Sequence, residues 1–297
     1  MKGIKVIASD MDGTLLLHQA NGEDIIGEET KNVLIEAQQA GYRLILASGR
    51  AYPKMLAFAK QLEMERYGGW LVEINGTAVY DLQHHKRKVF HQLHRQEIDT
   101  LYDKLKRQEF ELIACQDEAM YYHIPKRLIP VKQAYIRAHD LPEDHPLTGG
   151  GFEIVHDNRK GYPYLYAVDD VKQLPKTMNK LCITDDPQRL SLAEEILAPY
   201  RDRFWWGYTT KRWIEILPKA ANKLEGIRYC CEQMQVELKN VLAFGDGEND
   251  MEMLSHCGFG VAMGNALDSV KRIAYDVCDN NKNEGLAKVV AHLLTAS

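Results

Sequence analysis

The sequence predicts an α/β protein in which a parallel-sheet core is interrupted by an inserted α+β module. Short apolar runs rich in β-branched residues alternate with helical patterns near both ends of the chain. This alternation breaks off from about residue 82 to residue 216, and 297 residues exceed the usual size of a single domain. We therefore expect a core made of residues 1–81 and 217–297, with residues 82–216 as the insert.

The first half of the core follows a strand, helix, strand, helix, strand rhythm. Gly41 stops the first helical pattern, and the dipeptide Asn75-Gly76 is a hairpin turn signal. We expect strands at residues 5–9, 42–47 and 70–74, helices at 28–40 and 53–62, and a further strand at 77–80 after the turn.

The insert mixes short strands with amphipathic helices. Its first residues, 84–88, form a basic run that we interpret as a solvated face or linker. The aromatic run at 205–208 either packs inside the insert, which we favour, or stacks on a ring of a substrate. We expect helices at 96–108 and 188–197, a strand pair within 110–122, strands at 180–183, 203–207 and 213–216, and a Gly/Pro-rich loop at 141–151.

The second half of the core resumes the rhythm after Pro218. Residues 241–244 form an apolar strand that ends in the acidic run 245–250. We expect helices at 222–234, 251–256 and 285–294, and a further strand at 258–263.

The composition excludes several classes of protein. A formal net charge of −5 with 27% charged residues gives no indication of a nucleic acid or an anionic membrane as partner. No apolar run approaches the roughly 18 residues of a membrane span, and the amino terminus lacks the pattern of a signal peptide. The six cysteines show no C-x-x-C pair, so we expect free, buried thiols. The prediction is a cytoplasmic protein, a monomer or weak homodimer, whose partner is a small molecule.

Polar turns follow three of the predicted buried strands. Asp10 and Asp12 follow the first strand, Ser48 the second, and Asp246, Asn249 and Asp250 the strand at 241–244. The carboxyl ends of parallel strands meet at one edge of a sheet, where ligands bind. Carboxylates suit Mg²⁺, whereas the hydroxyl of Ser48 and the ammonium of Lys223 suit a phosphate group. The cluster indicates phosphoryl transfer.

These motifs resemble those of the haloacid dehalogenase superfamily of phosphatases, and of its Cof-like branch with a type IIB α/β cap. The resemblance rests on Asp10-Met11-Asp12-Gly13-Thr14-Leu15, on Ala47-Ser48-Gly49-Arg50, on Asn75-Gly76, on the run from Gly245 to Leu254 and on the run from Val261 to Ala266. It implies a Rossmann-like core whose insert is a cap that carries substrate specificity.

The resemblance also implies roles for the site residues. Asp10 would be the nucleophile that forms an aspartyl-phosphate, and Asp12 the general acid and base. Mg²⁺ would be held by Asp10, by the backbone carbonyl of Asp12 and by Asp246, with Asp250 acting on a metal-bound water or on Lys223. The residues expected to bind phosphate or substrate are Lys223, Thr14, Ser48, Gly49, Arg50 and Asn249.

One position departs from the family pattern. The lysine of the motif is usually followed by Gly, whereas Leu224 follows Lys223 here, and Lys219 is the alternative.

The expected activity is Mg²⁺-dependent hydrolysis of small phosphomonoesters, with sugar phosphates first among them. The alternatives are a phosphomutase, a dedicated sugar-phosphate phosphatase, or a sugar-phosphate-binding protein without catalysis. A receiver domain of the response-regulator type, which also phosphorylates an aspartate, does not account for Asp-x-Asp-Gly-Thr at the start of the chain or for so large an insert.

Overall fold

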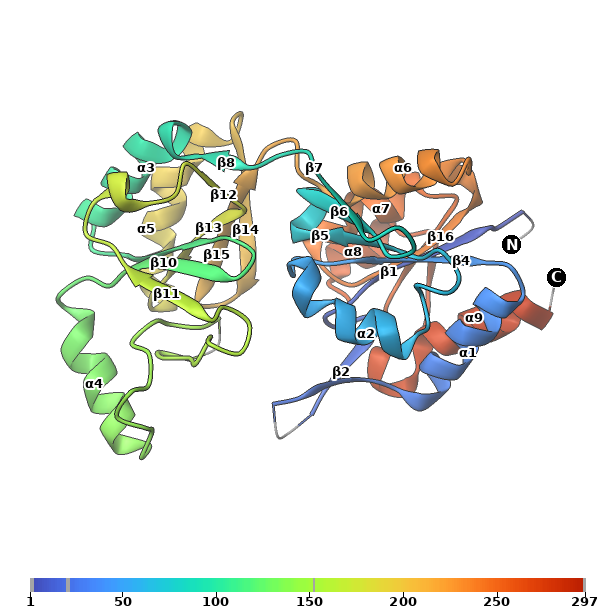
Figure 1. The fold of residues 1–297 in the computed structure, drawn as a ribbon, viewed down its shortest axis with the longest axis horizontal. Coiled ribbons are helices and arrows are strands. Elements are labelled where there is room, and N and C mark those ends of the chain that lie inside the picture. Colours follow the sequence, from blue (N-terminus) through green and yellow to red (C-terminus); the bar gives the residue numbers. More distant parts are fainter. Residues whose placement is uncertain (1–2, 20–21, 152, 296–297) are drawn as a thin grey trace. The chain divides into compact units, whose positions relative to one another are not determined.

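The computed structural model describes residues 3–19, 22–151 and 153–295, and Figure 1 shows its fold. The chain divides into two compact units, Met1–Phe90 with Asn222–Ser297, and His91–Ala221. Among the described residues, no helix combines the length and the apolar character needed to cross a membrane.

The first unit is a sheet covered by helices. Its sheet strands are β1 (Val6–Asp10), β4 (Arg43–Ala47), β5 (Trp70–Glu73), β6 (Ala78–Asp81), β7 (Lys86–Val89), β16 (Val241–Gly245), β17 (Phe259–Ala262) and β18 (Asp276–Val277), and a separate hairpin joins β2 (Leu16–His18) to β3 (Asp24–Ile26). Its helices are α1 (Glu28–Gln39), α2 (Leu56–Gln61), α6 (Lys223–Gln233), α7 (Met251–His256), α8 (Asp268–Ile273) and α9 (Gly285–Thr295).

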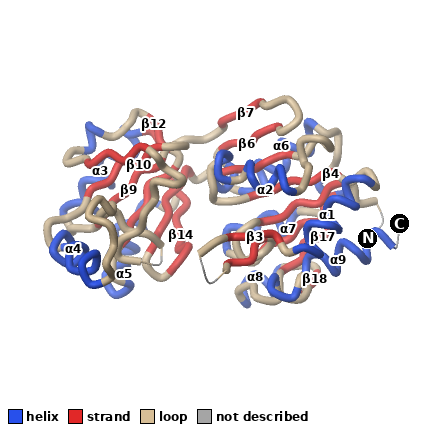
Figure 2. The backbone as a smooth tube through the Cα atoms, turned by 60° about the horizontal axis from the view of Figure 1, so that its bottom comes forward, coloured by secondary structure: helices blue, strands red, loops and turns tan. Residues whose placement is uncertain are grey.

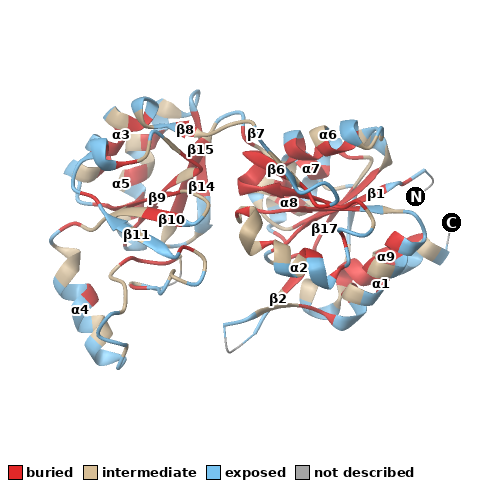
Figure 3. Cartoon of the chain, in the orientation of Figure 1, coloured by how far each residue is buried: buried red, intermediate tan, exposed pale blue. Residues whose placement is uncertain are grey.

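The strand order is β18-β17-β16-β1-β4-β5-β6-β7, and the strands from β18 to β5 are parallel. Helices α6 and α7 cover one face, whereas α1 and α9 pack together on the other (Figure 1). The central strands are buried on both faces, as Figure 3 shows in red, which explains their almost wholly apolar sequences. The predicted parallel α/β core is confirmed.

Strand β1 lies between β4 and β16, and the chain winds outward from it in both directions. The order of connections therefore reverses at β1. Crevices at such reversal points, outside the carboxyl ends of the strands, are where open α/β sheets bind ligands. Asp10, the last residue of β1, stands at that point.

The first boundary between the units lies later than the sequence predicts. Residues 86–89 form strand β7, which pairs antiparallel with β6 and so belongs to the first unit. Lys86 and Lys88 are exposed, as expected of a solvated run, because charged residues are tolerated on an edge strand. The second boundary lies at Ala221 rather than residue 216, since β15 of the other unit extends to Pro218.

The second unit is a mostly antiparallel sheet with helices. Its main sheet has the order β11 (Tyr164–Ala167), β10 (Ala119–His123), β9 (Glu111–Cys115), β13 (Lys180–Thr184), β15 (Trp213–Pro218) and β14 (Phe204–Thr210), and β8 (Leu93–His94) pairs with β12 (Thr177–Met178). Among the described strands of the main sheet, only the edge strand β11 pairs parallel with its neighbour, β10. Helices α3 (Arg95–Arg107) and α5 (Pro187–Leu197) pack with this sheet in one apolar core, and α4 (Leu128–Ala138) follows β10. In Figure 2 the strands of each unit, coloured red, run together as a sheet.

Trp206 is 9% exposed and belongs to the core of the second unit. For Trp206, this supports the interpretation that the aromatic run packs inside the second unit. Tyr208 is exposed, and its hydroxyl donates a hydrogen bond to Glu194 over 2.5 Å.

The main predicted helices and strands are confirmed to within about two residues, with two exceptions. Strand β14 extends to Thr210, three residues beyond the predicted end, and the helix predicted at 53–62 is divided. Residues 52–54 form a turn of 3₁₀-helix ahead of α2, and Pro53 lies in the first turn, where its missing N–H is tolerated. The sequence did not predict α4, α8, β11, β18 or the hairpin of β2 and β3. All are short or mostly exposed, so their apolar pattern is weak.

Candidate active site

The site is built on the turn that follows β1. Asp10 is only 5% exposed, and the chain then turns through Gly13, whose φ of +84° suits glycine. A Cβ on Gly13 would lie 2.3 Å from Oδ2 of Asp246, so the close approach also requires glycine. The two acidic turns after β1 and β16 are thereby brought together.

Lys223 is fully buried at the first position of α6 and contacts two carboxylates. Its Nζ donates to Oδ1 of Asp10 over 2.5 Å and to Oδ1 of Asp250 over 2.7 Å. Asn222 caps the helix by accepting a hydrogen bond from the N–H of Glu225, so Leu224 does not disturb the start of the helix. Lys219, the alternative, is exposed and lies in the other unit. The structure thus places Lys223 beside Asp10.

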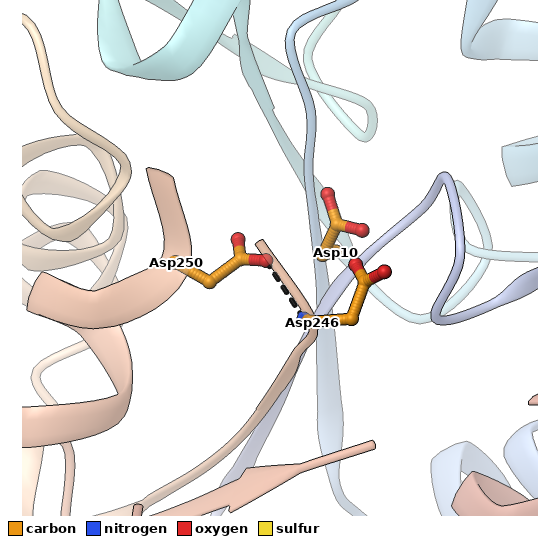
Figure 4. Close-up of side chains that lie close together, drawn as sticks. All are labelled: Asp10, Asp246 and Asp250. Carbon is orange, nitrogen blue, oxygen red and sulfur yellow. Dashed lines mark hydrogen bonds between the residues drawn. The ribbon is translucent and has the colours of Figure 1, made fainter. Parts of the chain in front are cut away.

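Asp250 organises the loop after β16. Its Oδ2 accepts hydrogen bonds from the N–H groups of Asp246 and Gly247, at 2.9 and 3.0 Å, and its Oδ1 accepts from Lys223. Both oxygens therefore have partners within the protein. Figure 4 shows the carboxylates of Asp10, Asp246 and Asp250 directed toward a common region.

Asp246 is held by side chains from two other loops. Thr14 Oγ1 donates to its Oδ1 over 3.3 Å, and Asn265 Nδ2 lies 3.4 Å from its Oδ2. The same amide of Asn265 donates to the carbonyl of Gly13 over 2.8 Å. Asn265 is a site residue that sequence reasoning missed, although it lies in the run from Val261 to Ala266 that carried the resemblance.

The carboxylates of this cluster are short of positive charge. Burial raises the pKa of Asp10 well above its ordinary value, although Lys223 works in the opposite direction. Burial, together with the neighbouring Asp250, raises the pKa of Asp246 to about 7. Crowded acidic groups ionise reluctantly unless a cation joins them.

The residues present fit a Mg²⁺ ion. One carboxylate oxygen from each of Asp10, Asp246 and Asp250 lies within 4.8 Å of the others. Oδ2 of Asp10 is buried and lacks a hydrogen-bond partner within the described chain. Hard oxygen ligands and an unsatisfied carboxylate suit Mg²⁺. The hydrogen bonds to both oxygens of Asp250 are 2.7 to 3.0 Å long, whereas those to Asp246 are 3.3 and 3.4 Å long. Asp10 and Asp246 are therefore the better candidates for direct contact.

Ser48 and its neighbours form the turn after β4. Ser48 is buried, and its Oγ accepts a hydrogen bond from the N–H of Arg50 over 3.1 Å. Gly49 lies against Asn75, whose Oδ1 accepts a hydrogen bond from Asn249 Nδ2 over 2.9 Å. Asn75 and Asn249 thus link the turn after β5 to the turn after β16.

Asp12 is directed differently from Asp10. Its side chain is 56% exposed and is ion-paired with Arg50. The two neighbouring carboxylates therefore lie in different environments, one buried beside Lys223 and the other solvated beside a guanidinium. Such a difference is how two acidic groups acquire different chemical roles.

Comparison with known proteins gives a consistent family. A model of the haloacid dehalogenase-like hydrolases matches residues 7–290. The chain is 25% identical over 292 residues to a 5-amino-6-(5-phospho-D-ribitylamino)uracil phosphatase of Bacillus subtilis, covering 97% of this chain and 95% of the relative. It is 26% identical over 295 residues to the pyridoxal phosphate phosphatase of Escherichia coli, covering 98% and 99%. The fold matches a haloacid dehalogenase-like hydrolase of Bacteroides thetaiotaomicron with a TM-score of 0.74 and 23% identity, covering 98% and 99% of the two chains.

Proposed function

Because this chain belongs to the haloacid dehalogenase-like hydrolase family, we propose that it is a phosphatase that hydrolyses small phosphomonoesters with Mg²⁺ through an aspartyl-phosphate. One observation carries the proposal. Asp10, at the reversal point of the sheet, shares Lys223 with Asp250 and lies within reach of Asp246. This arrangement supplies a nucleophile, a cation site and a fixed ammonium in one place.

In the first step a carboxylate oxygen of Asp10 attacks phosphorus. The new bond joins Asp10 to phosphorus, the bond from phosphorus to the ester oxygen breaks, and Asp12 gives its proton to the leaving alcohol. Lys223 holds Asp10 in place and adds positive charge where the phosphate oxygens gather. Ser48, whose Oγ accepts from the N–H of Arg50, would donate its own proton to a phosphate oxygen, while Thr14, whose hydroxyl donates to Asp246, would hold the loop around the phosphate.

In the second step water replaces Asp10 on phosphorus. Asp12 takes a proton from the water, the water oxygen bonds to phosphorus, and Asp10 leaves as a carboxylate. Inorganic phosphate is the product. Asp10 and Asp246, with the backbone carbonyl of Asp12, would hold Mg²⁺, which would supply charge that offsets the repulsion between the Asp10 carboxylate and the phosphate.

We propose sugar phosphates or phosphate esters of similar size as substrates. The two relatives named above act on phosphate esters of small ring-bearing molecules, according to their names. The second unit, His91–Ala221, would be the cap that selects among such esters, since an insert between the two halves of the core can close over a site and exclude water.

A direct test uses 4-nitrophenyl phosphate with Mg²⁺. The wild-type protein should release nitrophenolate, a chelator should stop the release, and Asp10→Asn should lower turnover by more than about 1,000-fold. Asp268→Asn, an exposed acidic residue of the same unit, is the matched control and should retain activity. Full activity of Asp10→Asn would overturn the proposal.

Product analysis then separates the alternatives. Incubation with a hexose 1-phosphate should yield free sugar and inorganic phosphate. An isomeric sugar phosphate without free phosphate would instead identify a phosphomutase. Tight binding of the sugar phosphate without any reaction under saturating Mg²⁺ would identify a binding protein.

A further inference from the structure

Arg50 lies between two carboxylates on different segments of the first unit. Its Nε donates to Oδ2 of Asp12 over 2.9 Å, and its Nη2 donates both to Oδ1 of Asp12 and, over 2.6 Å, to Oδ2 of Asp24. Arg50 thus binds Asp12 with two parallel hydrogen bonds and Asp24 with a third. This fork geometry fixes the direction of a carboxylate as well as its distance.

The position of Arg50 is itself fixed. Its N–H donates to Ser48 Oγ, and its carbonyl accepts a hydrogen bond from the N–H of Ile74 over 3.0 Å. The guanidinium carbon lies 5.7 Å from the centre of the Phe58 ring. Its side chain is only 23% exposed. The turns after β4 and β5 therefore fix the backbone of Arg50 independently of its contacts with Asp12 and Asp24.

Asp24 connects Arg50 to the hairpin of β2 and β3, which follows the turn that contains Asp12. It lies on β3, paired with β2, and it also interacts with Nδ1 of His18 over 3.0 Å. Burial raises the pKa of Asp24, but hydrogen bonds from Arg50 and His18 outweigh this effect and lower it overall. A line of polar contacts thus runs from the hairpin through Arg50 to Asp12.

Asp12 depends on Arg50 for its orientation. Within the described part of the chain, the carboxylate of Asp12 accepts its side-chain hydrogen bonds from Arg50. The side chain is more than half exposed, so packing does little to hold it. The Nε and Nη2 donors of Arg50 are in turn occupied by carboxylates, which leaves fewer donors for a phosphate group.

We propose that Arg50 is a positioning residue for Asp12 rather than a phosphate ligand, and that Asp24 supports it from the hairpin. The inference rests on the proposed phosphatase function. Arg50 would hold the Asp12 carboxylate so that it takes the proton from water as the water oxygen bonds to phosphorus and Asp10 departs. This differs from the sequence-based expectation, in which Arg50 contacts phosphate or substrate.

A substrate with a good leaving group makes the positioning of Asp12 by Arg50 measurable. Nitrophenolate leaves phosphorus without being protonated, so formation of the aspartyl-phosphate from 4-nitrophenyl phosphate does not need Asp12. Hydrolysis of the aspartyl-phosphate still needs it. Loss of positioning should therefore slow the second step selectively, so that phosphorylated enzyme accumulates.

The variants are Arg50→Met, Arg50→Lys and Asp24→Asn in the full chain, assayed with 4-nitrophenyl phosphate and Mg²⁺. Lysine keeps the charge but not the fork. Asp24→Asn leaves Arg50 and Asp12 unchanged and keeps the proposal testable if Arg50→Met does not fold. Arg66→Met is the matched control, because Arg66 forms an exposed pair with Glu63 over 3.3 Å.

For Arg50→Met we expect a burst of nitrophenolate approaching one per active site, followed by turnover reduced by about 10- to 100-fold. The fraction of enzyme trapped as phosphoenzyme by acid quench should rise above that of the wild type. The inhibition constant of inorganic phosphate should stay within about 3-fold. Arg50→Lys and Asp24→Asn should show the same change with smaller amplitude, and Arg66→Met should match the wild type.

Two results would overturn the positioning role. One is an Arg50→Met enzyme without a burst, whose affinity for inorganic phosphate falls more than tenfold, as expected of a phosphate ligand. The other is an Arg50→Met enzyme that behaves like Arg66→Met. In both cases the wild type still turns over, so the proposed function stands. A wild type that releases no nitrophenolate would instead overturn the proposed function and this inference together.

Discussion

The Nζ atom of Lys223 lies 2.5 Å from Oδ1 of Asp10, although 213 positions separate the two residues in the chain. Both groups are almost completely buried. Burial alone would lower the pKa of Lys223, but the carboxylates of Asp10 and Asp250 outweigh burial and raise it. The lysine therefore stays charged and offsets part of the negative charge gathered at the end of β1.

Lys223→Met should destabilise the fold as well as stop turnover. Removing one partner of a buried charge group leaves the others uncompensated, and such changes typically cost about 3–5 kcal/mol. Urea unfolding in the presence of a chelator measures the effect without a contribution from metal binding. Lys239→Met removes an exposed pair with Glu237 and should change stability little. Equal unfolding midpoints for the two variants would contradict this account.

Mg²⁺ should stabilise the protein through Asp10 and Asp246. A ligand that binds only the folded state adds about 2.7 kcal/mol at one hundred times its dissociation constant. We expect thermal unfolding of the wild type to move to higher temperature with Mg²⁺. Asp246→Asn should abolish this shift, while Asp268→Asn should keep it. A shift that persists in Asp246→Asn would place the metal elsewhere.

Gly13→Ala should damage the metal site more than the fold. Its Cβ would come within 2.3 Å of Oδ2 of Asp246, whereas a Cβ on Gly41, at a φ of +97°, would meet nothing within 4 Å. Each alanine adopts a left-handed conformation that costs about 1–2 kcal/mol. Gly41→Ala therefore reports the backbone cost alone. Activity and the Mg²⁺ shift should be lost in Gly13→Ala and kept in Gly41→Ala.

The second unit contains a buried ion pair that can be tested in the same way. Lys132 Nζ lies 2.6 Å from Glu111 Oε2 and donates to the carbonyl of Ile154 over 2.6 Å, so it ties α4 and the following loop to β9. Lys132→Met should cost about 3–5 kcal/mol, because Glu111 is left buried and unpaired. The double variant with Glu111→Leu should recover part of the loss. A double variant as unstable as the sum of the single ones would exclude coupling between the two residues.

The thiols should react slowly in the native protein. Burial raises the pKa of Cys231 and of Cys257 to about 12, and that of Cys278 to about 11. Cys278 is half-buried, whereas the other five cysteines are buried. With a disulfide reagent at mildly alkaline pH, Cys278 should react first, and all six thiols should react only after unfolding. Rapid reaction of several native thiols would contradict the described packing.

Sequence reasoning succeeded where apolar patterns and turn signals agree. Residues 44–47 of β4 and 241–244 of β16 are buried on both faces, so their apolar character is continuous and easily recognised. It was less successful at the margins of the sheet. The basic run at 84–88 overlaps the exposed edge strand β7, where hydrogen bonds to β6 determine the structure and side-chain hydrophobicity does not.

At the site, Asn265 and Arg50 also show where prediction from sequence alone fails. Asn265 contacts Gly13 and Asp246 across large separations in sequence, so no local pattern marks it as a site residue. Arg50 stands in the Ser48-Gly49-Arg50 turn, and the sequence indicates only that a cation is present. Its binding to Asp12 and Asp24 depends on how the hairpin of β2 and β3 folds back.

The sequence by itself determined the architecture and the chemical groups, because buried parallel strands must be apolar and their polar ends must meet at one edge. It thereby assigned Asp10, Asp12 and Asp246 to a common site, whereas Lys223, at the expected start of a helix, still had Lys219 as its alternative. Only the tertiary structure decided how these groups divide their contacts. Lys223 lies against Asp10 and Asp250, while Asp12 turns outward to Arg50. The reason is physical, since the partner of a charged side chain is chosen by three-dimensional distance and burial, which spacing along the chain does not specify.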